Sequence, residues 1–247
     1  LDLDTDYHTG AGDLVEAFYR PCLEAAIKYD RASGYFRSSV LQLVGTAFAD
    51  FAQRGGHARL VCSPRMTEED ALAVASGYER RDEVLGERLQ GELVQLLSHA
   101  RTARAVELLA TLVRLRALEV RIALRDTATG MYHEKLGIFE DRESNVVTFR
   151  GSANESRSAW DPSANHESFE VFCSWADQRE ALRCDRHKDY FDALWKGRID
   201  GVDTLPLPSA FYAKLLEYSD HEVTECTSAG SRPVGPVARE PLPHQVD

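Results

Sequence analysis

The first part of the chain alternates between segments whose apolar residues recur at a helical period and short segments typical of strands. Residues 12–30 place apolar side chains at helical spacing, and Pro21 is expected to kink or divide that helix. A short strand is expected over residues 32–36. The next helix, over residues 40–54, follows two serines that can cap it and ends before a glycine pair.

The same alternation continues downstream, with one long helical interruption. Residues 67–116 carry helical composition without a strand signal, so two or three helices are expected there. Short apolar or alternating segments elsewhere predict strands, and a last periodic segment predicts a helix. The expected strands are residues 57–62, 118–124, 132–139, 145–150 and 168–174, and the expected helix is 178–195.

This order of elements predicts an α/β domain, a mixed β-sheet flanked by helices on both faces, with a helical insertion at about 67–117. We assign residues 1–220 to it. Residues 221–247 are rich in Pro, Gly, Ser and Thr and have little to bury, so they are expected to form a linker that leads to a further C-terminal domain. The sequence shows no internal repeat of 20–50 residues.

Composition narrows the classes of function. Hydrophobic residues make up 43% and charged residues 28%, and no apolar run approaches the length that crosses a bilayer, so a cytoplasmic protein without membrane contact is expected. The five cysteines form no CxxC pair and are expected to be reduced packing thiols. The net charge of −11 weakens nucleic-acid binding, because phosphate affinity comes largely from Lys and Arg. Any such affinity must be local or come from another module.

Four polar residues on two neighbouring predicted strands carry the strongest chemical signal. His133 and Lys135 are two residues apart, as are Ser152 and Asn154, so each pair points to one face of its strand. A hairpin with its turn at about 141–145 would aim all four at one place. A phosphodiester needs a nucleophile, cations for its nonbridging oxygens and neutral donors that orient it, and this set offers all three.

These residues resemble the motif of the phospholipase D superfamily, H-x-K-x4-D-x6-G-S-x-N, of the kind with a single motif per chain. Here Glu140 stands in the place of the Asp, and ten residues instead of six separate it from Gly151. The four extra residues can be shared as two per strand, which keeps every side chain on its face. Glu140 is left out of the catalytic set, as either a surface turn residue or an ion-pair partner.

The resemblance spans about residues 30–195 and implies roles for individual residues. It implies a phosphodiesterase in which His133 attacks phosphorus, Lys135 and Asn154 hold the oxygens, and Ser152 assists. Glu167, in an Asn-His-Glu segment, would accept a hydrogen bond from the imidazole and fix its tautomer, with Glu170 as the alternative.

One histidine cannot be the nucleophile and the general acid at the same moment, so a second must be supplied. Single-motif members of the family build their site across a homodimer, and the run that starts at His187 lacks the motif spacing. We therefore expect a two-fold homodimer that brings two His133 residues together. The mechanism requires no metal and no cofactor, and no zinc-like spacing is present.

Two further features bear on the substrate. Residues 33–36 resemble the opening strand of these domains, although a plain core strand is equally plausible. A locally positive stretch is either a solvated helix face or a phosphate-binding groove. Its candidate substrate-binding residues are Arg101, Arg104, Arg114, Arg116 and Arg121.

The tail suggests a context. Residues 242–245 resemble the segment that opens the motor domain of superfamily 2 helicases, so the chain resembles the front of bacterial helicase-nuclease proteins used in restriction and phage defence. Our leading hypothesis is a nuclease that acts on DNA more readily than RNA. The alternatives are a phosphodiesterase for phospholipid or another small diester, and a nucleic-acid-binding or dimerisation module with little catalysis.

Overall fold

The computed structural model describes one eight-stranded sheet in the order β1-β7-β6-β5-β2-β3-β4-β8. The described residues are 1–34, 41–63, 85–94, 100–125 and 132–219, apart from 92, 155 and 162. The pairs β2-β3 and β3-β4 are parallel and the other pairs are antiparallel, so the sheet is mixed. The strands are β1 (Asp6–His8), β2 (Ala26–Ser33), β3 (His57–Cys62), β4 (Leu118–Arg125), β5 (Lys135–Asp141), β6 (Val146–Gly151), β7 (Ser168–Cys173) and β8 (Val202–Pro206).

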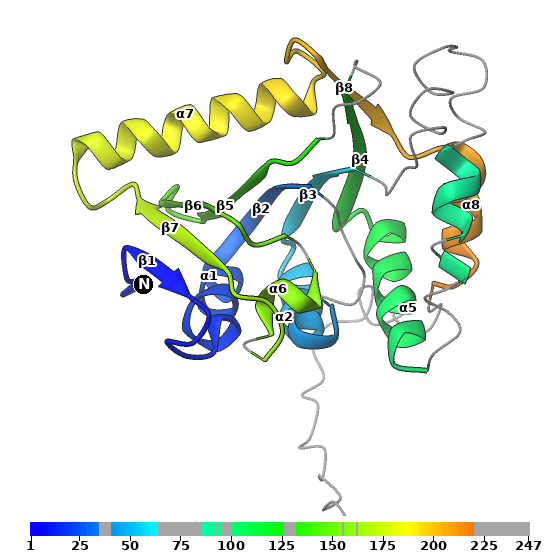
Figure 1. Ribbon diagram of the computed structural model, residues 1–247, viewed down its shortest axis with the longest axis horizontal. Coiled ribbons are helices and arrows are strands. Elements are labelled where there is room, and N and C mark those ends of the chain that lie inside the picture. Colours follow the sequence, from blue (N-terminus) through cyan, green and yellow to red (C-terminus); the bar gives the residue numbers. More distant parts are fainter. Residues whose placement is uncertain are drawn as a thin grey trace, which may run out of the picture.

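Helices lie on both faces of the sheet (Figure 1), so the predicted α/β architecture is confirmed. α7 crosses one face, and the shorter helices lie on the other, with α8 beside α5. The helices are η1 (Val15–Tyr19, a π-helix), α1 (Arg20–Ala25), α2 (Leu41–Gln53), α5 (Ala100–Arg114), α6 (Arg157–Trp160), α7 (Gln178–Trp195) and α8 (Ser209–Leu216). Of the expected insertion, the structure describes α5 and a helical stretch at 85–91, while the rest lies outside the described residues.

The predicted helix at 178–195 coincides with α7, and the strands expected at 57–62, 118–124 and 168–174 match β3, β4 and β7 within a residue. The end of the first predicted helix was wrong, because the chain changes from helix to strand at Ala26. β2 is a central strand with both faces covered, so it has a nearly continuous buried run that lacks the alternation of a half-exposed strand. Pro21 lies in the first turn of α1, where its missing N–H is tolerated.

Two apolar cores fill the space between the sheet and its helices. On the α1 side, aromatic rings pack edge to face around Phe18, Phe149 and Trp160. On the other face, Phe191 and Trp195 of α7 pack on β2, β3 and β4. Each fully buried aromatic ring contributes about 1.5–3 kcal/mol of transfer free energy. The described cysteines are free thiols, and none of the described helices has the length and apolar character needed to cross a bilayer.

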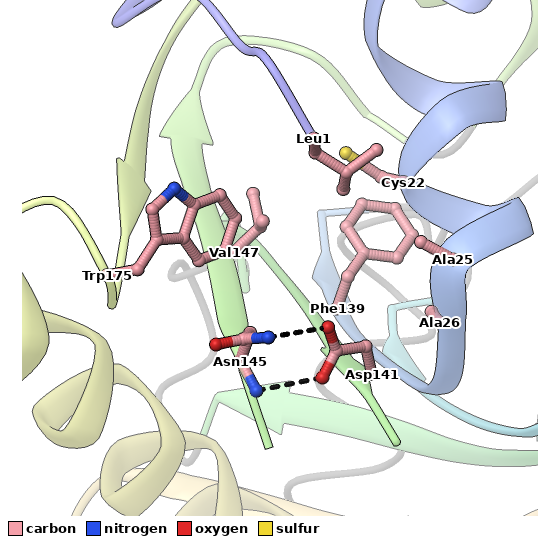
Figure 2. A pocket seen from close by; sticks show the side chains of 9 residues that line it. All are labelled: Leu1, Cys22, Ala25, Ala26, Phe139, Asp141, Asn145, Val147 and Trp175. Atoms are coloured by element: carbon pink, nitrogen blue, oxygen red, sulfur yellow. Dashed lines mark hydrogen bonds between the residues drawn. The ribbon is translucent and has the colours of Figure 1, made fainter. Parts of the chain in front are cut away.

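The hairpin of β5 and β6 closes at the predicted place. The carboxylate of Asp141 accepts hydrogen bonds from the backbone N–H and the Nδ2 of Asn145, both at 2.9 Å. These bonds lie at one side of a small pocket between the hairpin, α1 and Trp175 (Figure 2). The pocket is lined by both apolar and polar residues and lies at the end of the hairpin opposite to His133, so it is separate from the predicted site.

His187 lies on α7 and faces β6, where its Nδ1 is 2.7 Å from the Thr148 hydroxyl. Burial, followed by the charges of Arg150 and Arg183, lowers the pKa of His187 to about 4. His187 in the unfolded chain therefore takes up a proton near pH 6.5, whereas in the folded protein it does so only near pH 4. The free energy of unfolding decreases as the pH falls through this range. After a discount for partial solvent access, we expect a loss of about 2 kcal/mol.

Chemical denaturation at pH 7 and pH 4 tests this expectation. Carboxylates titrate over the same range, so the informative quantity is the difference between the wild type and His187→Gln. The variant should lose less free energy of unfolding than the wild type between the two pH values. Equal losses in both proteins would contradict a neutral, half-buried His187.

Candidate active site

The predicted site residues lie at one end of the strands, where β2 and β6 end and β5 and β7 begin. Ser33 at the end of β2 pairs with Lys135 at the start of β5. Gly151 at the end of β6 pairs with Phe169 near the start of β7. Because antiparallel neighbours place the end of one strand beside the start of the next, the short segments around these residues are neighbours in space.

Gly34, directly after β2, marks the point where the catalytic candidates converge. A methyl group on its Cα would lie 3.1 Å from the Cδ2 of His133, 3.1 Å from the Oδ1 of Asn154 and 3.3 Å from the Nζ of Lys135. Three polar side chains from two separate segments therefore face one small region beside a residue without a side chain. Because Gly34 has no Cβ, the backbone after β2 comes close to these side chains, whereas residues 35–36 of the segment 33–36 lie outside the described residues.

His133 and Lys135 differ in exposure. His133 is exposed and precedes β5, so the strand expected at 132–139 begins later than predicted. Lys135 is only 8% exposed, and its ammonium donates a hydrogen bond of 3.0 Å to the carbonyl of His133. Burial lowers the pKa of Lys135, and the nearby Arg31 lowers it further, against the opposing charges of Glu167 and Glu134.

Ser152 and Asn154 follow β6 and turn in different directions. Asn154 is 9% exposed, and its Oδ1 accepts a hydrogen bond of 3.5 Å from the hydroxyl of Ser33. The hydroxyl of Ser152 donates to the carboxylate of Glu167 and accepts from the backbone N–H of Ser168 at 3.0 Å. The structure thus places Asn154 with His133 and Lys135, while Ser152 bridges the site to β7.

Glu167 is buried, with 7% of its surface exposed, and lies at the same end of the strands, directly before β7. Its backbone N–H donates a 2.7 Å hydrogen bond to the hydroxyl of Thr9, and its carboxylate accepts from Asn165 at 3.1 Å and from Ser152. Among the described residues the carboxylate of Glu167 is bonded to Ser152 and Asn165, and its role in orienting an imidazole stays a prediction. Glu170, the alternative acid, is exposed on β7.

Two other acids lie near the motif without joining it. Glu134 accepts hydrogen bonds from Arg150 and, at 3.4 Å, from Tyr190 of α7. Glu140 lies toward the far end of β5 and pairs with Lys28 at 2.8 Å and Lys188 at 2.9 Å. Although burial acts to raise it, these two ammonium groups lower the pKa of Glu140. The residue in the place of the family's Asp is therefore an ion-pair partner that ties α7 to the sheet.

The five candidate arginines do not form one cluster. Arg104 lines a groove between α2, α5 and α6, whereas the side chain of Arg101 lies outside the described residues. Arg114 and Arg116 lie where α5 leads into the start of β4, at the end of the strands opposite to the site. Arg121 donates a 2.8 Å hydrogen bond to the carbonyl of Trp195 and stacks on its ring. Sequence proximity grouped residues that the fold separates.

Sequence reasoning missed two residues that support the site. Thr9 follows the edge strand β1, whose pairing with β7 has no local sequence signal. Arg31 is 1% exposed in a central strand, and a charged residue inside a buried strand is the signal that could have indicated it. Within the described part of the chain, no three His, Cys, Asp or Glu side chains gather as a metal ion would require.

Comparisons with known proteins concern the fold. No family model and no curated protein matches the chain. Solved structures similar to it include phosphatidylserine synthase from Haemophilus influenzae Rd KW20, at 12% identity and a TM-score of 0.48 over 89% of this chain and 45% of that one. Nuc, a phospholipase D family member from Salmonella typhimurium, is 13% identical with a TM-score of 0.43 over 81% and 96% of the two chains.

A third similar structure is TrmBL2, an archaeal chromatin protein, at 12% identity and a TM-score of 0.31 over 77% of this chain and 53% of that one. The chain spans less than half the length of the phosphatidylserine synthase. All three identities are low and all three TM-scores lie below 0.5. The case for any chemistry at this site therefore rests on its own side chains.

Proposed function

We propose that the chain is a metal-independent phosphodiesterase of the phospholipase D type, with His133 as its nucleophile. The convergence of His133, Lys135 and Asn154 beside Gly34 carries this proposal. An exposed imidazole can reach a substrate, and a buried ammonium with an amide beside it can bind the nonbridging oxygens of a phosphate. Removing an ammonium from water is costly, and a bound phosphate diester offsets that cost.

The reaction proceeds in two displacements. An imidazole nitrogen of His133 attacks phosphorus, a P–N bond forms, and the P–O bond to the leaving group breaks as a second imidazole donates a proton to the leaving oxygen. That second imidazole, now neutral, accepts a proton from a water molecule whose oxygen attacks phosphorus. The P–N bond then breaks and His133 is regenerated. Lys135 and Asn154 stabilise the charge on the oxygens in both steps.

A labelled DNA oligonucleotide and bis(p-nitrophenyl) phosphate, each incubated with the protein in EDTA, test this function. Hydrolysis in the presence of the chelator is expected, because the proposed mechanism uses side chains only. Parallel reactions with RNA and with phospholipid vesicles distinguish the possible substrates. Activity that disappears with EDTA, or an absence of turnover on all four substrates, contradicts the proposal and favours the binding-module alternative.

The second imidazole comes, in our proposal, from His133 of the partner subunit in a two-fold homodimer. A symmetric contact near the site edge would bring two copies of one exposed side chain together. In a re-equilibrated equal mixture of wild type and His133→Ala, roughly a quarter of the dimers carry two histidines if exchange is random. Activity near a quarter of the wild type supports the shared site, whereas activity near one half supports independent sites. Light scattering gives the solution mass in parallel.

We propose a nucleic-acid strand as the substrate, and the surface beside the site supports this choice. Arg104 and Arg157 line the groove between α2, α5 and α6, where the guanidinium of Arg157 also pairs with the carboxylate of Asp161 at 3.4 Å. Arg157 follows Asn154 by three residues, a stretch of chain that spans at most about 11 Å. Two guanidinium groups next to the site can hold phosphates on the strand beyond the cleaved bond, even in a chain of net charge −11.

Arg104→Ala and Arg157→Ala test the groove. Each is expected to raise the KM for a DNA oligonucleotide about tenfold, as expected for losing one hydrogen bond to a charged group, and to leave hydrolysis of bis(p-nitrophenyl) phosphate unchanged. The matched control is Arg142→Ala, in the hairpin turn at the end of the strands opposite to the site. It should change neither the KM for DNA nor the hydrolysis of bis(p-nitrophenyl) phosphate. Equal losses on both substrates would contradict a strand-binding groove.

We further propose that this chain is the nuclease module of a DNA restriction or phage-defence protein with a C-terminal helicase. The supporting observations are the linker-like composition of residues 221–247 and the helicase-like segment at 242–245, both outside the described residues. A motor that delivers the strand would compensate for the acidic surface. A full-length sequence without an ATP-binding GK[ST] motif would contradict this proposal.

A further inference from the structure

Arg31 is a buried cation that reaches the site from a neighbouring strand. It lies in β2, between β3 and β5, with 1% of its surface exposed. Its Nη2 donates a 2.5 Å hydrogen bond to the carbonyl of Ala153. Ala153 lies between Ser152 and Asn154, so this bond holds the backbone of the turn that carries both site residues.

The route of the Arg31 side chain depends on a glycine and an aromatic ring. Arg31 pairs in register with Gly137 of β5, which pairs in turn with Phe149 of β6. A Cβ on Gly137 would lie only 1.9 Å from the ring of Phe149, so the ring occupies space that the glycine leaves free. The guanidinium lies 4.8 Å from the centre of that ring. Stacking on the ring restricts the rotamers of Arg31 and directs it toward Ala153.

We infer that Arg31 is a positioning residue of the active site, which fixes the turn of Ser152 and Asn154 and contributes positive charge beside Lys135. This inference rests on the phosphodiesterase proposed above. Arg31 acts through the Ala153 carbonyl and through its electrostatic field, and it does not itself touch the reacting phosphate. It therefore differs from His133, Lys135 and Asn154, whose side chains face Gly34.

The charges around Lys135 give this inference a pH-dependent readout. Arg31 faces Lys135 from β2, Glu167 from the segment before β7, and Glu134 from its own segment, and the exposed His133 lies beside it. After burial, Arg31 is the largest influence that lowers the pKa of Lys135. Lys135 must keep its proton to bind phosphate oxygens, so activity declines as the pH rises through the pKa of Lys135. Removing the charge of Arg31 should move this alkaline limb to higher pH.

Two substitutions separate the charge of Arg31 from its hydrogen bond. Arg31→Lys keeps the charge but loses the guanidinium geometry, so kcat should fall about tenfold with the alkaline limb unchanged. Arg31→Met loses both, so kcat should fall about a hundredfold and the limb should move to higher pH. The control is Arg54→Met, which removes guanidinium bonds of 3.2 and 3.0 Å to the carbonyls of Leu23 and Glu24 at the opposite edge.

The assay is the pH dependence of kcat on bis(p-nitrophenyl) phosphate, with thermal unfolding of each variant in parallel. Wild-type kcat and an unmoved limb in Arg31→Met overturn the inference while the phosphodiesterase stands. If Arg31→Met does not fold, Arg31→Lys decides by its kcat alone, and a wild-type value overturns the inference. If the wild type hydrolyses no diester, the proposed function fails. The effect of Arg31 is then measured by NMR titration of the Lys135 ammonium, and a pKa of Lys135 unchanged in Arg31→Lys and raised in Arg31→Met supports its electrostatic role.

Discussion

His133→Ala is expected to reduce kcat on bis(p-nitrophenyl) phosphate by about 10⁴-fold or more, because the covalent route is lost with its nucleophile. The remaining groups, Lys135 and Asn154, should still bind the diester. KM should therefore change much less than kcat. Steady-state kinetics in EDTA measure both constants. The matched control is His57→Ala, which should retain wild-type activity. His57 pairs with Glu119 at the end of the strands opposite to the site.

The intermediate itself provides a second test of the same histidine. Substrate labelled at phosphorus should transfer label to the wild-type protein, and a phosphorus bonded to imidazole nitrogen should survive an alkaline quench better than an acid quench. His133→Ala should take up no label, and His57→Ala should take up as much as the wild type. Label that remains on His133→Ala, or activity within tenfold of the wild type, would assign the nucleophile to another residue.

The spacing of the motif predicted much of the site because the strand period fixes which side chains share a face. His133 and Lys135, which are two residues apart, both face Gly34 although His133 precedes the first residue of β5. The later start of β5 therefore did not change the predicted grouping. The same rule failed for Ser152 and Asn154. Both lie beyond the end of β6, where backbone turns replace the alternation, and only Asn154 faces Gly34.

Contacts between distant segments could not be predicted from local patterns. The bond from Ser152 to Glu167 depends on the pairing of β6 with β7, and the support from Thr9 depends on the edge strand β1. Arg121 illustrates the same limit, because its position in the sequence indicated a basic stretch whereas its side chain packs on Trp195. Long-range strand pairing determines these partners, and a single sequence does not specify it.

Although the chain is acidic overall, two cationic side chains are buried at the site. Arg31 and Lys135 are both buried there beside the carboxylate of Glu167, so two cations and one acid lie close together at the site. A phosphate would add negative charge beside these two cations, and hydrogen bonds from cations to phosphate oxygens are strong. Affinity for one phosphate is therefore compatible with a surface that repels polyanions, and the groove of Arg104 and Arg157 would have to guide the remainder of a strand.

Gly34→Ala is expected to lower kcat by up to about a hundredfold, the cost in rate of a displacement of about 1 Å in the catalytic groups. The added methyl would press on His133, Lys135 and Asn154 at 3.1–3.3 Å, and each must move by a few tenths of an ångström or rotate away. These contacts are with side-chain atoms, so the fold should survive. Gly34→Val, which is bulkier, should reduce activity further. Kinetics on bis(p-nitrophenyl) phosphate with thermal unfolding separate the effect on rate from the effect on stability.

Gly91→Ala is the matched control, because a methyl group there meets no atom within 4 Å. Gly91 lies in a helical stretch and is exposed, so the substitution should stabilise the protein by up to about 1 kcal/mol and leave kcat unchanged. A folded Gly34→Ala with wild-type kcat would mean that the three side chains do not act together on one phosphate. A loss of rate confined to Gly34→Ala and Gly34→Val, with unfolding temperatures near that of the wild type, would place the reacting phosphorus beside this glycine.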